Sequence, residues 1–354
     1  MKRVAIIAHG LSDGGAERVA SMLANYYDSI GHKVLYIAIY SDKKEYPLNK
    51  DIEYKFINAG EKKGLIALIY RSLEIKRSVS TFHADVAVSF IEHELFPLVL
   101  SHIPVIPSLR NDPKSTERGM FLKQIRNFNY AHSYKVIFQT QGAKMYFNPK
   151  IQKKGVIIRN PLKDNLPYWN EEQHKKVFMT ACRINTQKNI PMLIKAFEQF
   201  HKEFPEYILE IYGKGPESYL KELEQLCCEL EIQDSVFFKG HSTEIHKKMT
   251  ESEAFLLTSN YEGLSNAMLE AMAIGVPCIC TDCPPGGARE MIEPKNAGIL
   301  IPIGDVTALA QAMKQVAKSS EYRKQLSSRE KYIREELAKD KIYDQWSDVL
   351  RIKY

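Results

Sequence analysis

The sequence predicts an α/β protein made of two doubly wound, parallel-sheet domains, and three observations indicate this fold. The chain has 354 residues, which is enough for two domains of ordinary size, each with its own core. Short apolar runs of strand length alternate with longer segments of helix length, as in repeated βαβ units. Near the middle, Pro161 and Pro167 punctuate a linker, and the fresh apolar run KKVFMTACRI follows. We therefore predict a first domain over 1–165, a second over 166–338 and a last helix over 339–354.

Composition is typical of a globular protein, and the charge is uneven. Hydrophobic residues make up 44% and charged residues 26% of the sequence. The start reads as a first strand and not as a signal peptide, and no apolar run approaches the roughly 20 residues of a membrane span. We therefore expect a cytoplasmic protein. Residues 1–160 carry 24 Lys and Arg against 14 Asp and Glu, and residues 161–354 carry 25 against 29, so we expect the basic surface on the first domain.

The first βαβ unit carries a glycine-rich loop. The apolar run 4–8 predicts the first strand, and the loop LSDGGAER precedes a helix that begins near Ala16. The glycines stand at positions 10, 14 and 15, so they do not match the G-x-G-x-x-G dinucleotide fingerprint. The sequence therefore does not favour NAD, and a simple tight turn remains an alternative for this loop.

Two segments of the first domain combine basic and apolar residues. The predicted helix GLIALIYRSLEIKRSV begins at Gly64, and it fits either the surface of an anionic bilayer or a sheet with a solvated outer face. The stretch from Lys114 to Arg126 mixes cations with Met, Phe and Leu. It suggests a face for an anionic partner such as a lipid headgroup or a diphosphate, with a solvated surface helix as the alternative. No base-stacking module or zinc finger favours nucleic acid.

The cysteines suggest neither a disulfide framework nor a metal site. Cys278, Cys280 and Cys283 have the spacing C-x-C-x-x-C, but the first two alternate along a predicted strand and no fourth ligand lies nearby in the sequence. Small apolar cysteines pack well in such a strand. We predict no metal and no cofactor.

The second domain places two cations after its first strand. Arg183 lies in the turn, and Lys188 lies just before the predicted helix 190–204. Arg binds a diphosphate through a bidentate fork and Lys binds it as a point charge, so the pair can neutralise a diphosphate without a metal ion. Surface salt bridges are the alternative.

The stretch 258–282, TSNYEGLSNAMLEAMAIGVPCICTD, predicts a turn, a helix and a strand. Helix formers fill the segment that begins near Ser265, and Gly275 and Pro277 give the stop signal. This stretch holds the strongest functional pattern in the chain.

The start of this helix and two acids suit a ligand that contains a diphosphate. The backbone N–H groups of Leu264, Ser265 and Asn266 and the positive end of the helix dipole form an anion site, although an ordinary capped helix remains the alternative. Glu262 precedes the helix and Glu270 lies about 12 Å further along its axis. A retaining glycosidase needs its carboxylates about 5 Å apart, whereas a nucleotide-sugar has hydroxyls on both sides of its diphosphate.

The stretch resembles the E-x7-E signature of retaining nucleotide-sugar glycosyltransferases of the GT-B fold, family 4, with EGLSNAMLEAMAIGVP as its surround. The resemblance extends over nearly the whole chain, including RNPL before the linker and RINTQKN after the next strand. It implies two Rossmann-like domains that face each other across a cleft, with the last helix crossing back onto the first domain. It also implies transfer of a hexosyl group from a nucleotide diphosphate-sugar, with retained configuration and without a metal.

The resemblance assigns roles to matching positions. Glu262 is implied to hold sugar hydroxyls and Glu270 the ribose. Arg183 and Lys188 are implied to neutralise the diphosphate. Further contacts with the nucleotide-sugar are implied for glycines in several loops and for the start of the helix, namely Gly14, Gly15, Gly213, Gly215, Gly240, Leu264, Ser265 and Asn266.

One position departs from the family pattern. Many members carry a His near the end of a first-domain strand, where it points at the reacting sugar, and this sequence has Arg110, Asn111 and Asp112 there. These three are candidates for contact with the sugar or the acceptor. His93 and Glu94, after the preceding strand, are further candidates, although a lone loop histidine often has no role.

Charge and family together indicate the partners. We expect a donor that is a UDP-sugar, and a glycan acceptor that is free or linked to a polyprenyl diphosphate, in capsule, O-antigen or glycoprotein-glycan assembly. A basic first domain without a membrane span fits peripheral attachment to an anionic inner leaflet. Two alternatives remain open: a nucleotide-sugar epimerase of the same fold, and a non-catalytic sugar-nucleotide-binding subunit.

Overall fold

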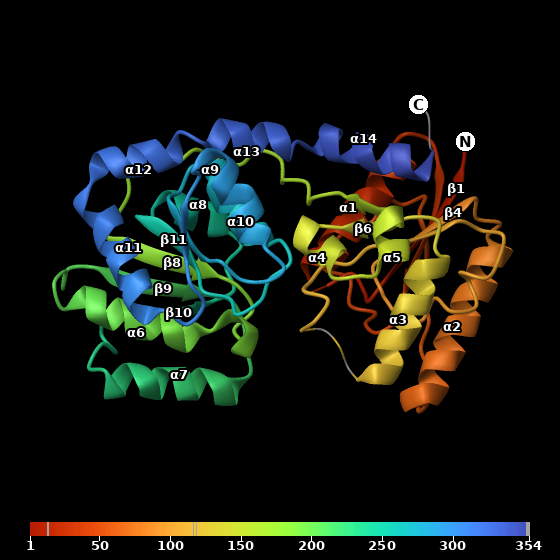
Figure 1. Cartoon of the computed structure of the whole chain (residues 1–354), viewed down its shortest axis with the longest axis horizontal. Helices are drawn as coiled ribbons and strands as arrows, with labels where there is room; N and C mark the ends of the chain where they lie inside the picture. Colours follow the sequence, from red (N-terminus) through yellow and green to blue (C-terminus); the bar gives the residue numbers. More distant parts are fainter. Residues whose placement is uncertain (13, 116, 118, 352–354) are drawn as a thin grey trace. The chain divides into compact units, whose positions relative to one another are not determined.

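The chain forms two compact units, each with a parallel sheet between helices (Figure 1). Unit 1 comprises Met1–Pro161 and Lys339–Tyr354, and unit 2 comprises Leu162–Ala338. The predicted α/β class with two parallel sheets is confirmed. The structure is a computed structural model that describes residues 1–12, 14–115, 117 and 119–351.

The main sheet of unit 1 has five parallel strands in the order β3-β2-β1-β4-β5. A single bridge between Ser108 and Ile137 leads on to the parallel pair β6-β7. The elements of unit 1 are β1 (Arg3–Ala8), α1 (Gly15–Ser29), β2 (Lys33–Ala38), β3 (Glu53–Phe56), α2 (Gly64–Thr81), β4 (Val86–Ser89), β5 (Val105–Pro107), α3 (Met120–His132), β6 (Val136–Phe138), α4 (Gln141–Met145), α5 (Pro149–Lys154), β7 (Gly155–Ile157) and α14 (Lys339–Leu350).

Helices cover both faces of this sheet because its central strand is apolar on both sides. Ile6 of β1 packs into one hydrophobic cluster and its neighbour Ile7 packs into another. Such two-sided burial produces the continuous apolar run of a parallel strand. Trp346 of α14 is fully buried in the first cluster. Tyr343 of α14 stacks on Tyr26 of α1, and Figure 1 shows the two helices side by side.

The amphipathic helix α2 packs on the sheet, but its outer face is apolar. Ile75 and Val79 are completely buried in the core. Lys62 and Lys63 are exposed just before the helix begins. Four aliphatic side chains on the outer face are each more than half exposed: Leu65, Ile66, Ile69 and Leu73. Packing on the sheet, one of the two predicted alternatives, is therefore correct, but water-facing polar residues do not fill the opposite side.

Part of the basic stretch from Lys114 to Arg126 turns inward. Arg126 is 1% exposed, forms an ion pair with Glu117 at 3.1 Å and donates to the Pro113 carbonyl at 2.9 Å. Lys123 also pairs with Glu117, at 3.1 Å. Both cations contact the loop before α3, and only Arg126 is buried; Lys114, Met120 and Phe121 are exposed. Thr116 and Arg118 of this stretch, and Asp13 of the glycine-rich loop, lie outside the described residues.

Unit 2 contains a six-stranded parallel sheet in the order β10-β9-β8-β11-β12-β13. Its elements are β8 (Val177–Ala181), the 3-10 turn η1 (Thr186–Lys188), α6 (Ile190–His201), β9 (Ile208–Tyr212), α7 (Glu217–Glu229), β10 (Val236–Gly240), α8 (Ile245–Thr250), β11 (Ala254–Leu257), α9 (Asn266–Ile274), β12 (Cys278–Thr281), α10 (Gly287–Ile292), the 3-10 turn η2 (Glu293–Lys295), β13 (Ile299–Ile301), α11 (Val306–Lys318), α12 (Ser320–Ser327) and α13 (Glu330–Glu336). Among the described residues of both units, no helix has both the length and the apolar content that crossing a bilayer requires.

A buried charged cluster fixes the amino-terminal end of β11. Glu253, immediately before this strand, is 1% exposed. It accepts from Arg323 at 2.9 Å and pairs with His174 at 2.8 Å. The Tyr207 hydroxyl also donates to it, at 3.2 Å. Arg323 forms a second ion pair with Glu171 at 2.6 Å. The hydrogen bond to Glu253 raises the pKa of His174 against the opposing effect of its burial.

We expect the free energy of unfolding to fall as pH rises through the raised pKa of folded His174. In the unfolded chain this histidine titrates near its ordinary pKa of about 6.5, so its contribution is complete below that pH and is lost above it. Urea unfolding followed by circular dichroism between about pH 5.5 and 8.5 measures the slope. His174→Gln should flatten it, whereas His102→Gln, at an exposed position in unit 1, should not. Equal slopes in all three proteins would contradict this account.

Candidate functional site

The strand order of unit 2 reverses between β8 and β11. Loops that follow two such strands diverge at the carboxyl edge of the sheet, which is where doubly wound sheets bind ligands. The loop after β8 carries Arg183 and Lys188, and the loop after β11 carries Glu262. The topology therefore brings together three residues that the sequence predicts for the site.

Lys188 and Glu262 form an ion pair at this edge. Their side chains are 11% and 18% exposed, so the pair is sheltered but not closed off. Lys188 donates to Oε2 of Glu262, and the Gln187 amide and the Ser259 hydroxyl donate to the same oxygen, each at 3.3 Å. Within the described part of the chain no hydrogen bond ends on Oε1. Three donors thus fix one carboxylate oxygen and leave the other available to a ligand.

Further hydrogen bonds join the two loops. The Asn260 amide N–H donates to the Gln187 carbonyl at 2.8 Å, and the Thr258 hydroxyl donates to the Lys188 carbonyl at 2.9 Å. The Asn189 side chain donates to that of Asn260 at 2.9 Å. The position of the ion pair is therefore set by backbone as well as side-chain contacts.

Arg183 takes no part in this ion pair. Its side chain is exposed, and the described residues provide no hydrogen-bonded or ion-paired partner for its guanidinium. An exposed, unpaired guanidinium beside a sheltered ammonium makes this edge positively charged on one side.

Helix α9 begins and ends as predicted. The Ser265 hydroxyl accepts from the Met268 N–H at 3.4 Å as the N-cap, and Gly275 ends the helix with a φ of 94°. Leu264 and Asn266 take part in contacts within the chain. The start of α9 is thus a capped helix end with its dipole, and an anion site at the N–H groups of Leu264, Ser265 and Asn266 stays a prediction.

Glu270 is held inside unit 2 by a residue that the sequence analysis missed. Glu270 is 4% exposed, and its Oε2 lies 2.8 Å from Nε2 of His246 on α8. The histidine bridges α8 and α9 and orients the carboxylate.

The loop glycines of unit 2 allow the backbone to approach closely. A Cβ on Gly213 would lie 1.7 Å from the Cys182 carbonyl oxygen, and one on Gly215 would lie 2.3 Å from that of Ile184. The Gly213 N–H donates to the Gly240 carbonyl at 2.8 Å. The loops after β8, β9 and β10 are thereby tied together on the side of the sheet edge that carries Arg183.

The remaining predicted residues belong to unit 1. Gly14 is the N-cap of α1 and Gly15 is the first residue of that helix. Asp112 is buried and accepts from the Ser115 N–H at 2.7 Å, while the Asn111 side chain accepts from the Asp112 N–H. The backbone carbonyl of His93 accepts from the Asn129 side chain at 3.2 Å. Asn111 and Asp112 thus shape their own loop.

Arg110 has an unusual environment. Its Nη1 donates to Asn160 at 2.7 Å, and its guanidinium carbon lies 5.0 Å from the Phe90 ring centroid and 5.6 Å from that of Trp346. Its Nε and Nη2 are shielded from solvent and have no hydrogen-bond partner among the described residues. Burial lowers the pKa of Arg110 to about 9.

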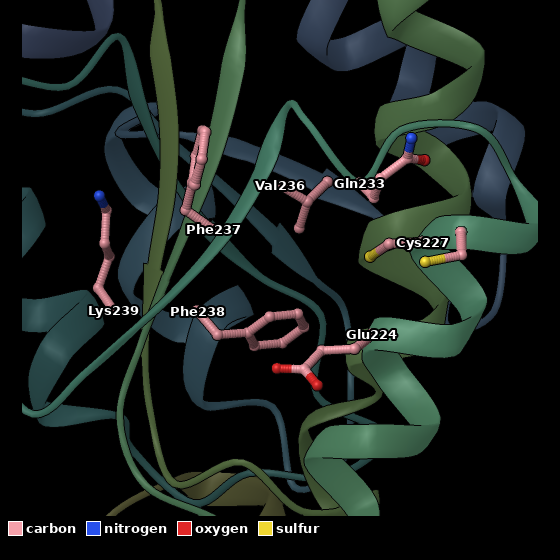
Figure 2. A pocket seen from close by; sticks show the side chains of 8 residues that line it. Glu224, Cys227, Gln233, Val236, Phe237, Phe238 and Lys239 are labelled. Carbon is pink, nitrogen blue, oxygen red and sulfur yellow. The ribbon is translucent and has the colours of Figure 1, made fainter.

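A surface hollow of unit 2 lies away from the predicted site residues. It has a volume of about 360 Å³ and lies between α7 and β10. Figure 2 shows side chains that line it, among them Phe237, Phe238 and Glu224. It is open, and none of the predicted site residues lines it. Cys278 and Cys280 are buried in β12, and the described residues contain no group of three or more His, Cys, Asp or Glu that could hold a metal ion.

Comparison with known proteins gives the family. Residues 164–332, nearly all of unit 2, match the family of glycosyl transferases group 1. The segment 164–332 thus has the sequence pattern of that family. A glycosyltransferase of Haemophilus influenzae is 24% identical, with 99% of this chain and 100% of that protein aligned. The GalNAc-α-(1→4)-GalNAc-α-(1→3)-diNAcBac-PP-undecaprenol α-1,4-N-acetyl-D-galactosaminyltransferase of Campylobacter jejuni is 22% identical over 98% of this chain and 97% of its own length.

Solved structures give the same fold. The crystal structure of Anabaena HepE in complex with UDP and glucose superposes with a TM-score of 0.86 at 17% identity, covering 99% of this chain and 100% of that one. The chain thus has the GT-B fold. The family match and the relatives above support glycosyltransferase activity.

Sequence reasoning missed the side chains that position the two acids of this glycosyltransferase. Gln187 and Ser259 hold Glu262, and His246 holds Glu270. Gln187 directly precedes Lys188, and Ser259 lies three positions before Glu262, so both are close in the sequence to predicted site residues. His246 is 24 positions from Glu270, and their contact depends on how α8 packs against α9.

We expect Gly287→Ala to disturb the Glu262 loop. A Cβ at Gly287 would lie 1.8 Å from the Gly263 carbonyl oxygen, so the loop must move, with a loss of about 1–3 kcal/mol in the free energy of unfolding. Urea unfolding and glycosyl transfer should both be measured. Gly304→Ala is the control for transfer: its positive φ strains the backbone at the substituted residue, but the open space around it leaves the Glu262 loop in place. Wild-type transfer by Gly287→Ala would show that the loop tolerates the displacement.

Proposed function

We propose that this glycosyltransferase moves a hexosyl group from a UDP-sugar to a hydroxyl of a polyprenyl-diphosphate-linked glycan, with retained configuration, in the assembly of a surface polysaccharide or glycan. The observation that carries the proposal is the Lys188–Glu262 ion pair at the strand reversal of unit 2, with one carboxylate oxygen open and Arg183 unpaired.

The two cations suit a departing diphosphate. The ammonium of Lys188 has three donors, and the bond to Glu262 uses one of them. Arg183 offers a fork of N–H groups that matches two phosphate oxygens. Charge stabilisation of this kind at a sheltered site is usually the largest contribution to catalysis. In this proposal Arg183 and Lys188 take the place that a metal ion holds in other transferases.

The two acids suit the two ends of the donor. Oε1 of Glu262 accepts a sugar hydroxyl, and Glu270, oriented by His246, accepts from the ribose. The bond from the anomeric carbon to the diphosphate breaks while the bond to the acceptor oxygen forms on the same face. The acceptor proton passes to the departing diphosphate oxygen, so no enzyme carboxylate is bonded to the sugar. The UDP and glucose bound to HepE support this choice of donor.

A lipid-linked acceptor implies contact with a membrane. The Campylobacter relative is named for an undecaprenol-linked acceptor, and residues 1–160 of this chain are strongly basic. We propose that the outer face of α2 docks on an anionic leaflet from the cytoplasmic side. Four exposed aliphatic side chains lie between Lys62 and Lys63 at one end and Lys76 and Arg77 at the other.

We expect Arg183→Ala and Lys188→Ala each to lower kcat by about a hundredfold or more, because each removes a charge that stabilises the leaving group. Transfer of labelled sugar from a panel of UDP-sugars to lipid extracts measures this. Lys221→Ala, on the exposed face of α7, is the control. Near wild-type kcat in either variant would count against the assignment. Conversion of the donor sugar without an acceptor would favour an epimerase, and no donor consumption with any extract would favour a non-catalytic subunit.

We expect a variant with Leu65→Asn, Ile66→Asn and Ile69→Asn to bind vesicles of phosphatidylglycerol and phosphatidylethanolamine several-fold less than wild type, because it loses apolar contact with the acyl chains. Sedimentation at low and high salt separates this loss from charge attraction. Ile303→Asn removes an exposed aliphatic side chain from unit 2 and should have no effect. If wild-type vesicle binding depends neither on the charge of the lipid nor on the salt concentration, the membrane proposal is refuted.

A further inference from the structure

The sheet of unit 1 has its own strand reversal, between β1 and β4. Doubly wound sheets bind ligands at the carboxyl edge beside such a reversal. The residues that follow the strands here include His9 after β1, Tyr40 after β2 and Glu94 after β4. Their side chains form one cluster, and the proposed donor chemistry of unit 2 does not use it.

Glu94 is a buried carboxylate with few partners. It is 2% exposed, and the Tyr40 hydroxyl donates to its Oε1. Within the described residues no ion pair to this carboxylate forms. An ionised carboxylate offers about four acceptor positions, and burial of a charge is costly unless it is well satisfied. Glu94 therefore keeps unused capacity to accept hydrogen bonds.

The surroundings of Glu94 are rigid. The Asn129 side chain, fully buried on α3, donates to the backbone carbonyls of Glu92 and His93 at 2.9 and 3.2 Å. These contacts fix the loop that carries Glu94 before any ligand arrives.

Tyr40 is fixed as well, yet it reaches the surface. Its ring stacks with that of His9 at a centroid distance of 4.9 Å, and the Arg71 guanidinium lies 4.3 Å from its centroid. The residue is nevertheless 48% exposed. A partly exposed aromatic ring beside an under-satisfied carboxylate offers apolar contact and hydrogen-bond acceptors at one place.

We propose that Glu94 and Tyr40 form a subsite that binds the hydroxyl groups of a neutral pyranose, the acceptor sugar. This inference rests on the proposed function, because it names the acceptor side of the same reaction. Sugar hydroxyls supply the donors that Glu94 lacks, and the C–H face of a pyranose suits the edge of Tyr40. A phosphate is excluded by repulsion from the carboxylate, and a cationic ligand is disfavoured by Arg71 beside the ring. Glu94 binds the sugar directly, and Tyr40 also positions Glu94.

The test compares Glu94→Gln and Tyr40→Phe with wild type in steady-state transfer to farnesyl-diphosphate-linked N-acetylgalactosamine from a panel of UDP-sugars. We expect Glu94→Gln to raise the KM for this acceptor by about tenfold or more, because bonds to a charged group are lost. Tyr40→Phe, which keeps the ring stacking, should raise it by a smaller factor. The Kd for UDP should stay at its wild-type value in both, and both should keep a single cooperative urea-unfolding transition. Glu61→Gln changes an exposed carboxylate of the same unit and is the control.

Saturation-transfer NMR with methyl α-N-acetylgalactosaminide measures sugar binding without requiring transfer. Loss of this binding in Glu94→Gln supports the subsite. Absence of transfer to the farnesyl acceptor by wild type would count against the proposed acceptor class, and it would leave this binding result standing. Acceptor KM and glycoside binding that match wild type in Glu94→Gln would overturn the inference. A rise in the acceptor KM of Glu94→Gln together with a similar loss of UDP affinity and of stability would also overturn it, because that combination indicates a structural role for Glu94.

Discussion

The Lys188–Glu262 ion pair is the contact on which the proposed donor site depends. It joins residues 74 positions apart in the sequence, and it forms only because β8 and β11 are neighbours in the sheet. The loops around it are tied by backbone bonds that do not involve the two charges. The ion pair is therefore set in place by the fold, and its charges remain available for chemistry.

Much of unit 2 could be predicted from the sequence because its signals are local. Capping by Ser265, the stop at Gly275 and the placement of Arg183 and Lys188 after a strand all follow from short-range chemistry. Contacts between distant segments could not be predicted. His246 meets Glu270 because α8 packs on α9, and no local pattern around His246 indicates this.

Unit 1 shows where a sequence pattern is ambiguous. The basic and apolar mixture around α3 suggests an anionic partner, but Arg126 turns inward to Glu117 and to a loop carbonyl. The similar mixture in α2 leaves its aliphatic residues outside. Composition is alike in the two segments, but packing buries Arg126 and leaves Lys76 and Arg77 exposed. Tertiary packing decides which side chains are buried, and the pattern of a single sequence does not predict it.

Strand β11 separates two kinds of buried charge. At its start Glu253 is satisfied by Arg323, His174 and Tyr207, and such a saturated cluster stabilises a fold without room for a ligand. Beyond its other end, four residues or about 13 Å along the strand, the bonds to Glu262 converge on one oxygen and leave the other open. Glu94 in unit 1 is more deeply buried, and the Tyr40 hydroxyl is its one side-chain donor among the described residues. Because a sheltered polar group that lacks hydrogen-bond partners costs stability, a ligand that supplies the missing bonds at either carboxyl edge would recover part of that cost.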